Sequence, residues 1–312
     1  MSNILIIKHG SLGDIIQISG VLKDLRENYK DKKIFILTTK PYTDLLNNCP
    51  YIDEVLLDKR LPRWNLLYLW NLKKKLKKFS FTNIIDLQNS SRTSFYRKYL
   101  LSKSKWSSTE TTLEKDQIKK DFDKDSVLKR FKVQLEKSSL SNLNCLKPDF
   151  SWAIKNVDEI INFFFNKKFI LIFPFCSPKH PHKKWPHMNK LINIIKSNHE
   201  DFEIALAPGP NEVIASKKFD AIIVTNNNVA LNIMELGGLI NKASYIISND
   251  TGPAHMSAHL GKKGIVLFGH HTTPEKVSIE TENFKSLKKK KLIELSPEEV
   301  YLKIKEHLSL IN

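Results

Sequence analysis

The chain has 312 residues, of which 41% are hydrophobic and 10% aromatic, a content that is ample for buried cores and argues against global disorder. Its formal net charge of +17 would suit a nucleic-acid-binding protein, but only six of the 50 basic residues are arginine, which leaves 44 lysines. Because proteins that read base edges rely on arginine, the charge favours bulk solvation, an anionic membrane or an acidic acceptor over nucleic acid.

The N-terminus and the cysteines predict a cytoplasmic protein. The opening stretch MSNILIIKHGSLGD has no basic n-region and no small-residue cleavage site, so it predicts a first strand and not a signal peptide. No apolar stretch approaches the roughly 18–20 residues that span a bilayer. The three cysteines, Cys49, Cys145 and Cys176, are far apart and form no C-x-x-C pair, which suits a reducing cytoplasm and argues against a structural zinc site.

Short apolar runs alternate with longer amphipathic segments along the chain. The runs predict strands at 4–7, 34–38, 83–88, 169–175, 203–208, 220–224, 245–248 and 264–269. Several show little polar alternation, which is typical of strands buried on both faces of a parallel sheet. The helical segments between them, such as 14–29, complete the βαβα pattern of an α/β protein. Residues 102–150 are polar and show no strong strand, so the pattern predicts two α/β halves with a boundary near 150–165.

The first of three unusual loops is KHGSLGDII, residues 8–16. It follows a strand and opens a helix, and Gly10 and Gly13 would let the backbone approach a ligand closely at an anion-favouring helix N-terminus. A full G-x-G-x-x-G is lacking, so a dinucleotide fingerprint is not supported. Asp14 is explained either as a first-turn carboxylate, worth roughly 0.3–1 kcal/mol, or as a general base.

The second loop, residues 173–191, follows the strand predicted at 169–175. It contains the small polar pair Cys176-Ser177, then Lys183 and Lys184, which could supply point charges for a phosphate, and the helix-opening pair Trp185-Pro186. Three histidines of this loop, at positions 180, 182 and 187, are irregularly spaced, so a metal site is not favoured.

The third loop is SNDTGPAHMSAHLG, residues 248–261. Helix-end chemistry explains Asp250, Thr251, Pro253 and Gly261 as turn, cap, helix start and C′ residue. It does not explain His255 in the first helical turn, where a phosphate or ribose would lie. His255 and His259 have the one-turn spacing of a metal pair, but no Glu stands between them as in H-E-x-x-H, so anion binding is the better hypothesis.

Together these loops resemble glycosyltransferase family 9, which includes the ADP-heptose:lipopolysaccharide heptosyltransferases, and the resemblance covers nearly the whole chain. The matching residues are Ser11 to Asp14, Asp86-Leu87-Gln88 with Arg92 and Thr93, Lys183 to Pro186, Gly209 to Glu212, Asp250 to His255, Leu267-Phe268-Gly269, and the closing 296–300. Two departures, Ser19-Gly20 in the first helix and His270 to Pro274 where the family usually reads P-T-x-P, concern the identity of the donor more than the reaction.

The resemblance implies two facing Rossmann-like domains with an interdomain cleft, the GT-B arrangement. Residues 1–155 would bind the acceptor and residues 156–312 the nucleotide sugar, and the last helix is a candidate to pack back on the first domain. The implied reaction is an inverting, metal-independent transfer of a heptose from ADP-heptose to a lipopolysaccharide core acceptor. The nucleotide sugar is a co-substrate, and no cofactor or metal is expected.

The resemblance also implies roles for particular residues. Asp14 would be the catalytic base, with Ser11 and Gly13 in the phosphate or acceptor loop. The donor-binding residues would be Ser177, Lys183, Glu212, Asp250, Thr251, Gly252 and His255. Lys183 and the helix start would stabilise the leaving diphosphate, and Glu212 would accept hydrogen bonds from the ribose.

On the acceptor side, Arg60, Arg63 and Arg92 could bind carboxylates or phosphates of an acidic glycolipid. The stretch 64–79 predicts an amphipathic helix with Leu66, Leu69, Leu76 and Phe79 on one face. Such a stripe is more often core than membrane-docking. We nevertheless predict salt-sensitive peripheral attachment to anionic lipid through the first half, at the inner face of the cytoplasmic membrane.

Three alternatives to ADP-heptose transfer stay open from the sequence. A related transferase could use another donor, such as a UDP-sugar, and only the altered segment 270–274 supports it. A non-catalytic nucleotide- or sugar-binding module would keep the phosphate loops and would not need Asp14. A basic nucleic-acid-binding protein would show a steep salt dependence of oligonucleotide binding.

Overall fold

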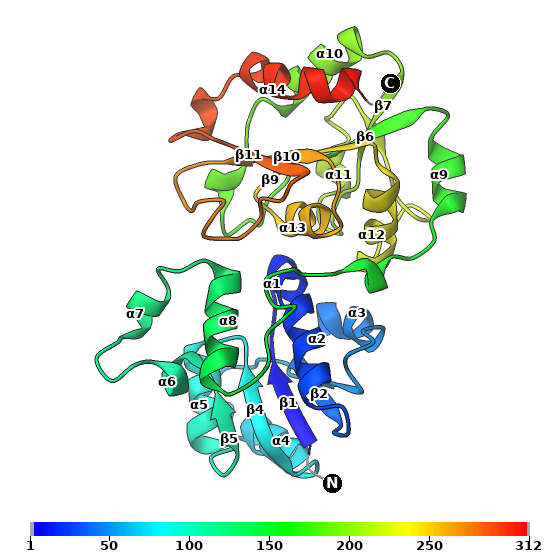
Figure 1. Ribbon diagram of the computed structural model, residues 1–312. Helices are drawn as coiled ribbons and strands as arrows, with labels where there is room; N and C mark the ends of the chain where they lie inside the picture. The colour runs from blue at the N-terminus through cyan, green and yellow to red at the C-terminus, as the bar shows by residue number, and fades with distance from the viewer. Residues whose placement is uncertain (1–2, 311–312) are drawn as a thin grey trace. The chain divides into compact units, whose positions relative to one another are not determined.

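The computed structural model describes residues 3–310, and the chain divides into two compact units, Met1–Trp152 and Ala153–Asn312. Within the described residues, the first unit contains a five-stranded sheet and the second a six-stranded sheet, both with parallel strand pairs. Each sheet carries helices on its two faces (Figure 1). The prediction of two Rossmann-like α/β domains is therefore confirmed.

The sheet of the first unit has the strand order β3-β2-β1-β4-β5. Its strands are β1 (Asn3–Ile7), β2 (Ile34–Thr38), β3 (Glu54–Leu57), β4 (Phe81–Asp86) and β5 (Lys105–Ser107). Its helices are α1 (Leu12–Gln17), α2 (Ser19–Asn28), α3 (Thr43–Asn47), α4 (Leu66–Lys77), α5 (Ser91–Tyr99), α6 (Thr109–Thr112), α7 (Lys119–Phe122) and α8 (Val127–Lys137), with a 3-10 turn at Lys40–Tyr42. The helix expected at 14–29 is divided into α1 and α2 at Ile18.

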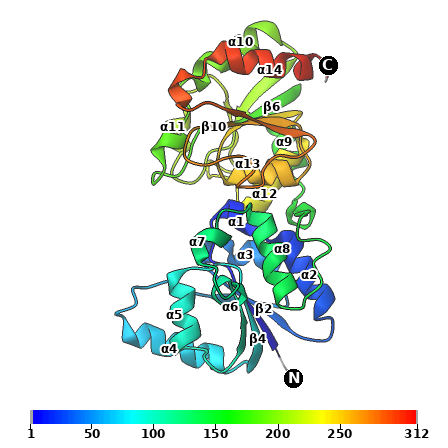
Figure 2. The same cartoon turned by 60° about the vertical axis from the view of Figure 1, so that its left-hand side comes forward.

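Helices α4 and α5 cover one face of this sheet, and α2 and α8 lie on the other (Figure 2). Alternate residues of β1, such as Leu5 and Ile7, join a core with Leu69, Leu72 and Leu76 of α4. The intervening residues of β1 are also fully buried. Burial on both faces explains why this strand reads as a continuous apolar run.

The sheet of the second unit has the strand order β11-β10-β9-β6-β7-β8. Its strands are β6 (Lys168–Phe173), β7 (Phe202–Leu206), β8 (Ile222–Ile223), β9 (Tyr245–Asn249), β10 (Gly264–Phe268) and β11 (Phe284–Lys288). Its helices are α9 (Asp158–Phe164), α10 (Met188–Asn198), α11 (Val213–Ser216), α12 (Ile233–Lys242), α13 (Gly252–His259) and α14 (Pro297–Ser309), with 3-10 turns at Pro181–Lys183 and Leu292–Glu294. A further 3-10 turn, Ser151–Ala153, spans the boundary between the two units.

Helices α10 and α14 lie side by side on one face of the second sheet, and α12 and α13 lie on the other (Figures 1 and 2). The last helix, expected as a candidate to pack back on the first domain, buries Val300, Ile304 and Leu308 in the core of the second unit. These are its fully buried apolar positions, so its packing stripe is used within its own unit. No helix within residues 3–310 has the length and apolar character needed to cross a bilayer.

In both sheets the chain order reverses beside the first strand of the unit. The reversal lies at the β1/β4 pair in the first unit and at the β6/β9 pair in the second. Open α/β sheets bind ligands at the carboxyl ends of the strands at such a point. The loop with Asp14 follows β1, the loop with Lys183 follows β6, and Asp250 directly follows β9. These three predicted site residues therefore follow strands at the points where each sheet favours a ligand.

Candidate active site

The loop that follows β1 is shaped by a glycine. Gly10 has φ +116°, a conformation that L side chains rarely adopt, and a Cβ there would collide with the ring of Tyr42. The close approach of the loop to Tyr42 therefore requires glycine at this position. Ser11 follows as the N-cap of α1, and Gly13 is buried in the first turn.

Asp14 is held by three donors in this loop. Its Oδ2 accepts hydrogen bonds from the backbone N–H of Ser11 at 2.7 Å and from the Ser11 hydroxyl at 2.8 Å. Its Oδ1 lies 3.2 Å from the Nζ of Lys8. Burial alone would raise the pKa of Asp14, but the Lys8 ammonium and the Ser11 hydrogen bonds outweigh it and lower the pKa below its usual value. At neutral pH the group is a carboxylate.

These contacts fit both explanations of Asp14. The bonds with Ser11 satisfy a helix N-terminus, as a cap residue would. The Asp14 side chain is nevertheless 40% exposed, so it remains accessible to a substrate hydroxyl. Lys8 in turn is buried and also donates to the carbonyl of Leu87, at 3.1 Å, beyond the end of β4. Asp14 is therefore oriented by a lysine that ties β1 to β4 at the strand-order reversal.

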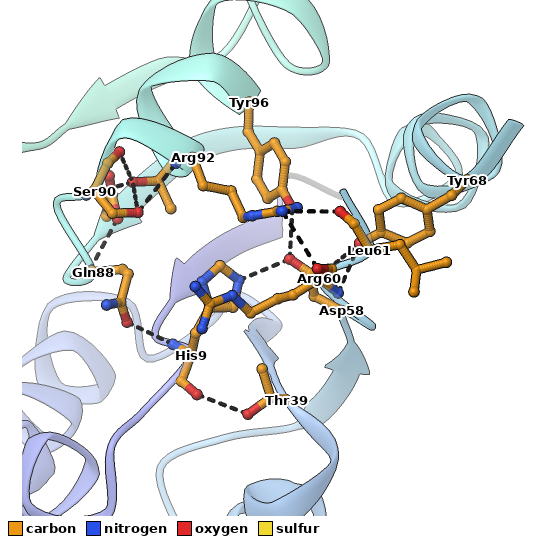
Figure 3. Close-up of polar contacts among 12 residues, drawn as sticks. His9, Thr39, Asp58, Arg60, Leu61, Tyr68, Gln88, Ser90, Arg92 and Tyr96 are labelled. Atoms are coloured by element: carbon orange, nitrogen blue, oxygen red, sulfur yellow. Dashed lines mark hydrogen bonds and ion pairs between the residues drawn. The ribbon is translucent and has the colours of Figure 1, made fainter. Parts of the chain in front are cut away.

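A buried polar network lies behind this loop, at His9 (Figure 3). The Nε2 of His9 lies 2.9 Å from Oδ2 of Asp58, and both side chains are fully buried. Tyr96 donates to the same carboxylate oxygen at 2.8 Å, and Tyr68 donates to the other. Burial alone would raise the pKa of Asp58. The hydrogen bonds from His9 and Tyr68, together with the electrostatic effect of His9, outweigh burial and bring this pKa to about 2. No local sequence pattern indicated this network.

The backbone of His9 is fixed on both sides as well. Its N–H donates to Oε1 of Gln88 at 2.9 Å, and its carbonyl accepts from the hydroxyl of Thr39 at 2.8 Å (Figure 3). His9 directly precedes Gly10, so these bonds position the start of the loop that carries Asp14. The structural signal for the network is that Asp58 and His9 both follow strands of one parallel sheet, whose carboxyl ends meet at one edge.

The three arginines expected on the acceptor side lie around the β3–α4 loop and the start of α5. Arg92 donates to the hydroxyl of Tyr96 at 3.0 Å and to the carbonyl of Leu61 at 2.9 Å (Figure 3). Arg63 donates to the carbonyl of the first residue of α5 at 3.4 Å. Arg60 is exposed, and its backbone N–H donates to Asp58 at 2.7 Å. The guanidiniums of Arg92 and Arg63 thus serve local structure, while Arg60 is exposed.

A polar pocket of about 200 Å³ opens at the carboxyl ends of β4 and β5. Its wall includes Ser94, Arg97, Trp106, Glu110 and Lys119. Glu110 accepts from Ser94 at 2.5 Å and from Arg97 at 2.7 Å, which fixes three side chains of the wall. An aromatic ring with a few oriented polar groups is typical of small-molecule sites. The sequence analysis singled out none of these five residues.

In the second unit, Lys183 and Asp250 meet although they are 67 positions apart. The Nζ of Lys183 lies 2.7 Å from Oδ2 of Asp250. Asn249 holds the two segments together, because its side-chain amide donates to the carbonyl of Pro174 at 2.8 Å and its Oδ1 accepts from the backbone N–H of Trp185 at 3.3 Å. The loops after β6 and β9 are thus joined where the sequence analysis placed a phosphate site.

Two histidines complete the surroundings of Asp250. The Nε2 of His271 lies 2.8 Å from Oδ2, and the Nε2 of His255 lies 3.9 Å from Oδ1. Burial alone would raise the pKa of Asp250, but Lys183 and the hydrogen bond with His271 lower it below its usual value. Burial lowers the pKa of His271. Within residues 3–310, no three His, Cys, Asp or Glu side chains are grouped so that they could hold a metal ion.

Helix α13 begins and ends as its sequence predicted. Thr251 is the N-cap in an extended conformation, and Gly252 and Pro253 are the first two helical residues. Gly261 has φ +70° and is the C′ residue, and the N–H of Lys262 donates to the carbonyl of Ser257 at 3.1 Å. Pro253 has no N–H, and the N–H groups of Ala254 and His255 donate to the carbonyl of Thr251 at 3.1 and 3.3 Å, so an anion at this helix N-terminus would meet mainly the N–H of Gly252.

Glu212 and Ser177 are not part of the Asp250 cluster. The carboxylate of Glu212 accepts from the backbone N–H of Gly209 at 2.8 Å, and burial raises its pKa above the usual value. Lys184 is the cation whose charge acts on Glu212. Ser177 is exposed, and its hydroxyl accepts from the N–H of Lys179 at 3.4 Å. Both follow strands, β7 and β6, that are neighbours in the sheet.

The model of glycosyltransferase family 9 (heptosyltransferase) matches residues 69–303. The lipopolysaccharide core heptosyltransferase OpsX of Haemophilus influenzae is 26% identical over 283 residues, which are 85% of this chain and 78% of that protein. The structure of E. coli ADP-heptose lps heptosyltransferase II has a TM-score of 0.75 at 16% identity, covering 99% of both chains. That of E. coli heptosyltransferase WaaC with ADP-2-deoxy-2-fluoro heptose has a TM-score of 0.71 at 14% identity, covering 98% of this chain and 99% of that one.

Proposed function

Because the chain belongs to glycosyltransferase family 9 and is a glycosyltransferase, we propose that it moves a heptose from ADP-heptose to a lipopolysaccharide core acceptor. The relative from Haemophilus influenzae is a lipopolysaccharide core heptosyltransferase, and the solved structure of E. coli heptosyltransferase WaaC is one with ADP-2-deoxy-2-fluoro heptose. The observation that carries the proposal is the cluster of Lys183, Asp250 and His255 at the N-terminus of α13.

On the donor side, Lys183 and the N-terminus of α13, with the N–H of Gly252, would hold the diphosphate. Lys183 is 22% exposed and paired with Asp250, so a diphosphate can reach it by sharing or replacing that carboxylate. The lysine and the helix N-terminus would then stabilise the negative charge that develops on ADP as the bond to the sugar breaks. In this mechanism they supply the positive charge that a divalent metal supplies in other transferases. The half-buried Glu212 would accept hydrogen bonds from the ribose.

On the acceptor side, Asp14 would take the proton of the attacking hydroxyl. The oxygen forms a bond to the anomeric carbon from the side opposite ADP, the bond from that carbon to the diphosphate oxygen breaks, and the configuration inverts. Asp14 is ionised and has an exposed side chain, as this role requires. Its lowered pKa makes it a weak base at rest, so proton transfer would follow rather than precede the attack.

The acceptor's sugar would bind in the pocket at the ends of β4 and β5. Trp106 offers a ring face, and Ser94, Glu110 and Lys119 offer hydrogen-bonding groups to sugar hydroxyls and acidic substituents. Arg60 would add an exposed cation, whereas Arg92 and Arg63 would help by holding the loop. The acceptor is a glycolipid in this proposal, so the enzyme would work at the cytoplasmic face of the membrane, attached peripherally to anionic lipid.

A different nucleotide sugar is the alternative that one observation favours. His271 contacts Asp250 in the segment where the family usually reads P-T-x-P, so the donor pocket of this chain differs there. Calorimetric titration with ADP, UDP, GDP and NAD, each with and without a chelator, separates the two. Preference for ADP that survives chelation supports the proposal. Preference for another nucleotide keeps the fold and changes the donor, and binding of none of them contradicts a donor site here.

A further inference from the structure

Helix α4 and the loop before it expose large apolar side chains to solvent. Trp64 is 79% exposed, Leu66 74%, Leu67 70% and Trp70 58%. The opposite side of the same helix, with Leu69, Leu72 and Leu76, is buried in the core of the first unit. The helix is therefore apolar on both sides, and only one of them is needed for folding. We call the exposed set Trp64, Leu66, Leu67 and Trp70 the outer α4 face.

The outer α4 face is flanked by a strongly basic segment. Residues 59–85 contain eight lysines and arginines and no acidic residue, and five of these lysines lie at 73–78. The Nζ of Lys74 lies 5.1 Å from the ring centroid of Trp70, so charge and aromatic surface are adjacent. Lys73 donates to the carbonyl of Tyr99 at 2.8 Å, which brings a further half-exposed aromatic residue, at the end of α5, beside α4.

We propose that the outer α4 face inserts into the interface of an anionic lipid bilayer, with the lysines at 73–78 contacting the headgroups. Grouped exposed apolar side chains on a folded domain mark an interaction surface. Tryptophans beside lysines are typical of segments that lie in the membrane interface. A second copy of the chain is the poorer occupant, because it would bring the same lysines against each other, whereas anionic headgroups neutralise them.

Membrane insertion would bring the enzyme to its glycolipid acceptor, so the purpose of this surface rests on the proposed function. The test of membrane binding does not depend on that function. It predicts attachment in two parts, an apolar part that added salt does not remove and an electrostatic part that salt screens. A purely electrostatic contact would instead vanish at high salt.

The test is co-sedimentation of the full chain with two kinds of phosphatidylcholine vesicles, one without anionic lipid and one with roughly 30% phosphatidylglycerol, which supplies the negative surface charge. We expect the wild type to bind the anionic vesicles, more weakly but measurably at high salt. The variant Trp64→Ser/Leu66→Ser/Leu67→Ser/Trp70→Ser should lose at least about ten-fold in affinity, since it removes the apolar part of the contact. The matched control Phe163→Ser/Ile214→Ser changes side chains that are 81% and 86% exposed in the second unit, and it should bind as the wild type does.

A second readout reports insertion itself. With Trp64 or Trp70 replaced by Phe, the blue shift of tryptophan fluorescence on anionic vesicles should shrink. Absence of wild-type binding, equal binding by the four-residue variant, or a shift unchanged in both Trp→Phe variants overturns the proposal. So does a dimer that the four-residue variant abolishes, or oligonucleotide binding in place of vesicle binding. ADP affinity of the four-residue variant should stay at the wild-type value, which verifies its fold and separates this test from that of the donor.

Discussion

In each unit, one aspartate of the candidate site follows a strand at the point where the strand order of the sheet reverses. The two aspartates are held in opposite ways. Asp14 is 40% exposed, and its partners Lys8 and Ser11 lie within six positions of it. Asp250 is 3% exposed, and two of its partners, Lys183 and His271, come from other loops, 67 and 21 positions away. The local arrangement leaves a carboxylate accessible, whereas the non-local one buries a carboxylate between a lysine and a histidine.

The comparison predicts different kinds of failure when each unit's aspartate cluster is altered. A change at Asp14 should affect the chemical step and leave nucleotide binding intact. A change around Asp250 should affect nucleotide binding first. A third carboxylate, Asp58, serves as a structural reference because both its side chain and that of its partner His9 are fully buried.

The largest effect is expected for Asp14→Asn. An amide cannot accept the proton of the acceptor hydroxyl, and loss of a general base commonly costs about 10²- to 10⁴-fold in rate. Turnover should fall by that factor while ADP affinity, measured by calorimetry, stays within two-fold or so of the wild type. Ser11→Ala is the matched control, because it removes a hydrogen bond to the carboxylate and keeps the base. Wild-type turnover in Asp14→Asn would show that Asp14 is only a helix cap.

The next effect is expected for Lys183→Ala. Hydrogen bonds to charged groups contribute about 1.5–3 kcal/mol, so ADP affinity should fall roughly 10- to 150-fold. Lys184→Gln is the control, since Lys184 is the neighbouring cation in the sequence but acts on Glu212, whereas Lys183 is paired with Asp250. If both variants bind ADP equally, the diphosphate does not use the Asp250 cluster. A loss of affinity in Lys183→Ala with wild-type thermal stability would exclude simple unfolding of the site.

Sequence patterns were sufficient for the central strands and for one edge strand, β8, and insufficient for the other three edges. The eight predicted runs overlap β1, β2, β4 and β6 to β10, and the three missed strands, β3, β5 and β11, all lie at sheet edges. An edge strand has a neighbour on one side only and is partly exposed, so it lacks a continuous apolar run. Strand β11, FKSLK, buries Phe284 alone.

The same limit applies to the side-chain clusters. Asp14 and Ser11 could be paired from sequence because a capping interaction is local. The contacts of Asp250 with His271 and of Asp58 with His9 depend on which strands become neighbours, and no local pattern encodes that. Leu66 was wrongly grouped with Leu69 and Leu76 in one stripe. It lies roughly 80° around the helix from Leu76 at 100° per residue, and the structure exposes it.

The lowered pKa of Asp58 predicts how the stability of the folded protein depends on pH. Its pKa is about 2 in the folded protein against the usual value of 3.8, so the folded state favours the ionised form. The stabilisation is fully present above the unfolded pKa and is lost as pH falls from about 4 through about 2, amounting to about 2 kcal/mol. Urea denaturation at pH 7, 4 and 3 should show this loss, and Asp58→Asn should be less stable at pH 7 with a flatter acid limb. An unchanged acid limb in Asp58→Asn would assign acid unfolding to other carboxylates.

The smallest effect is expected for His271→Thr, and it tests how the Asp250 cluster is tuned. A neutral hydrogen bond contributes about 0.5–1.5 kcal/mol, so ADP affinity at pH 8 should fall by roughly two- to ten-fold, because Asp250 then competes more strongly for Lys183. The pKa of His271 is lowered by burial, so its ring is neutral at pH 8 and gains a proton only on acidification. Wild-type affinity should therefore rise more than that of the variant as pH falls, since the new positive charge lies beside the diphosphate. If the ADP affinities of the two proteins changed in parallel with pH, His271 would lie outside the donor site, and Lys183 would be the principal cation of that site.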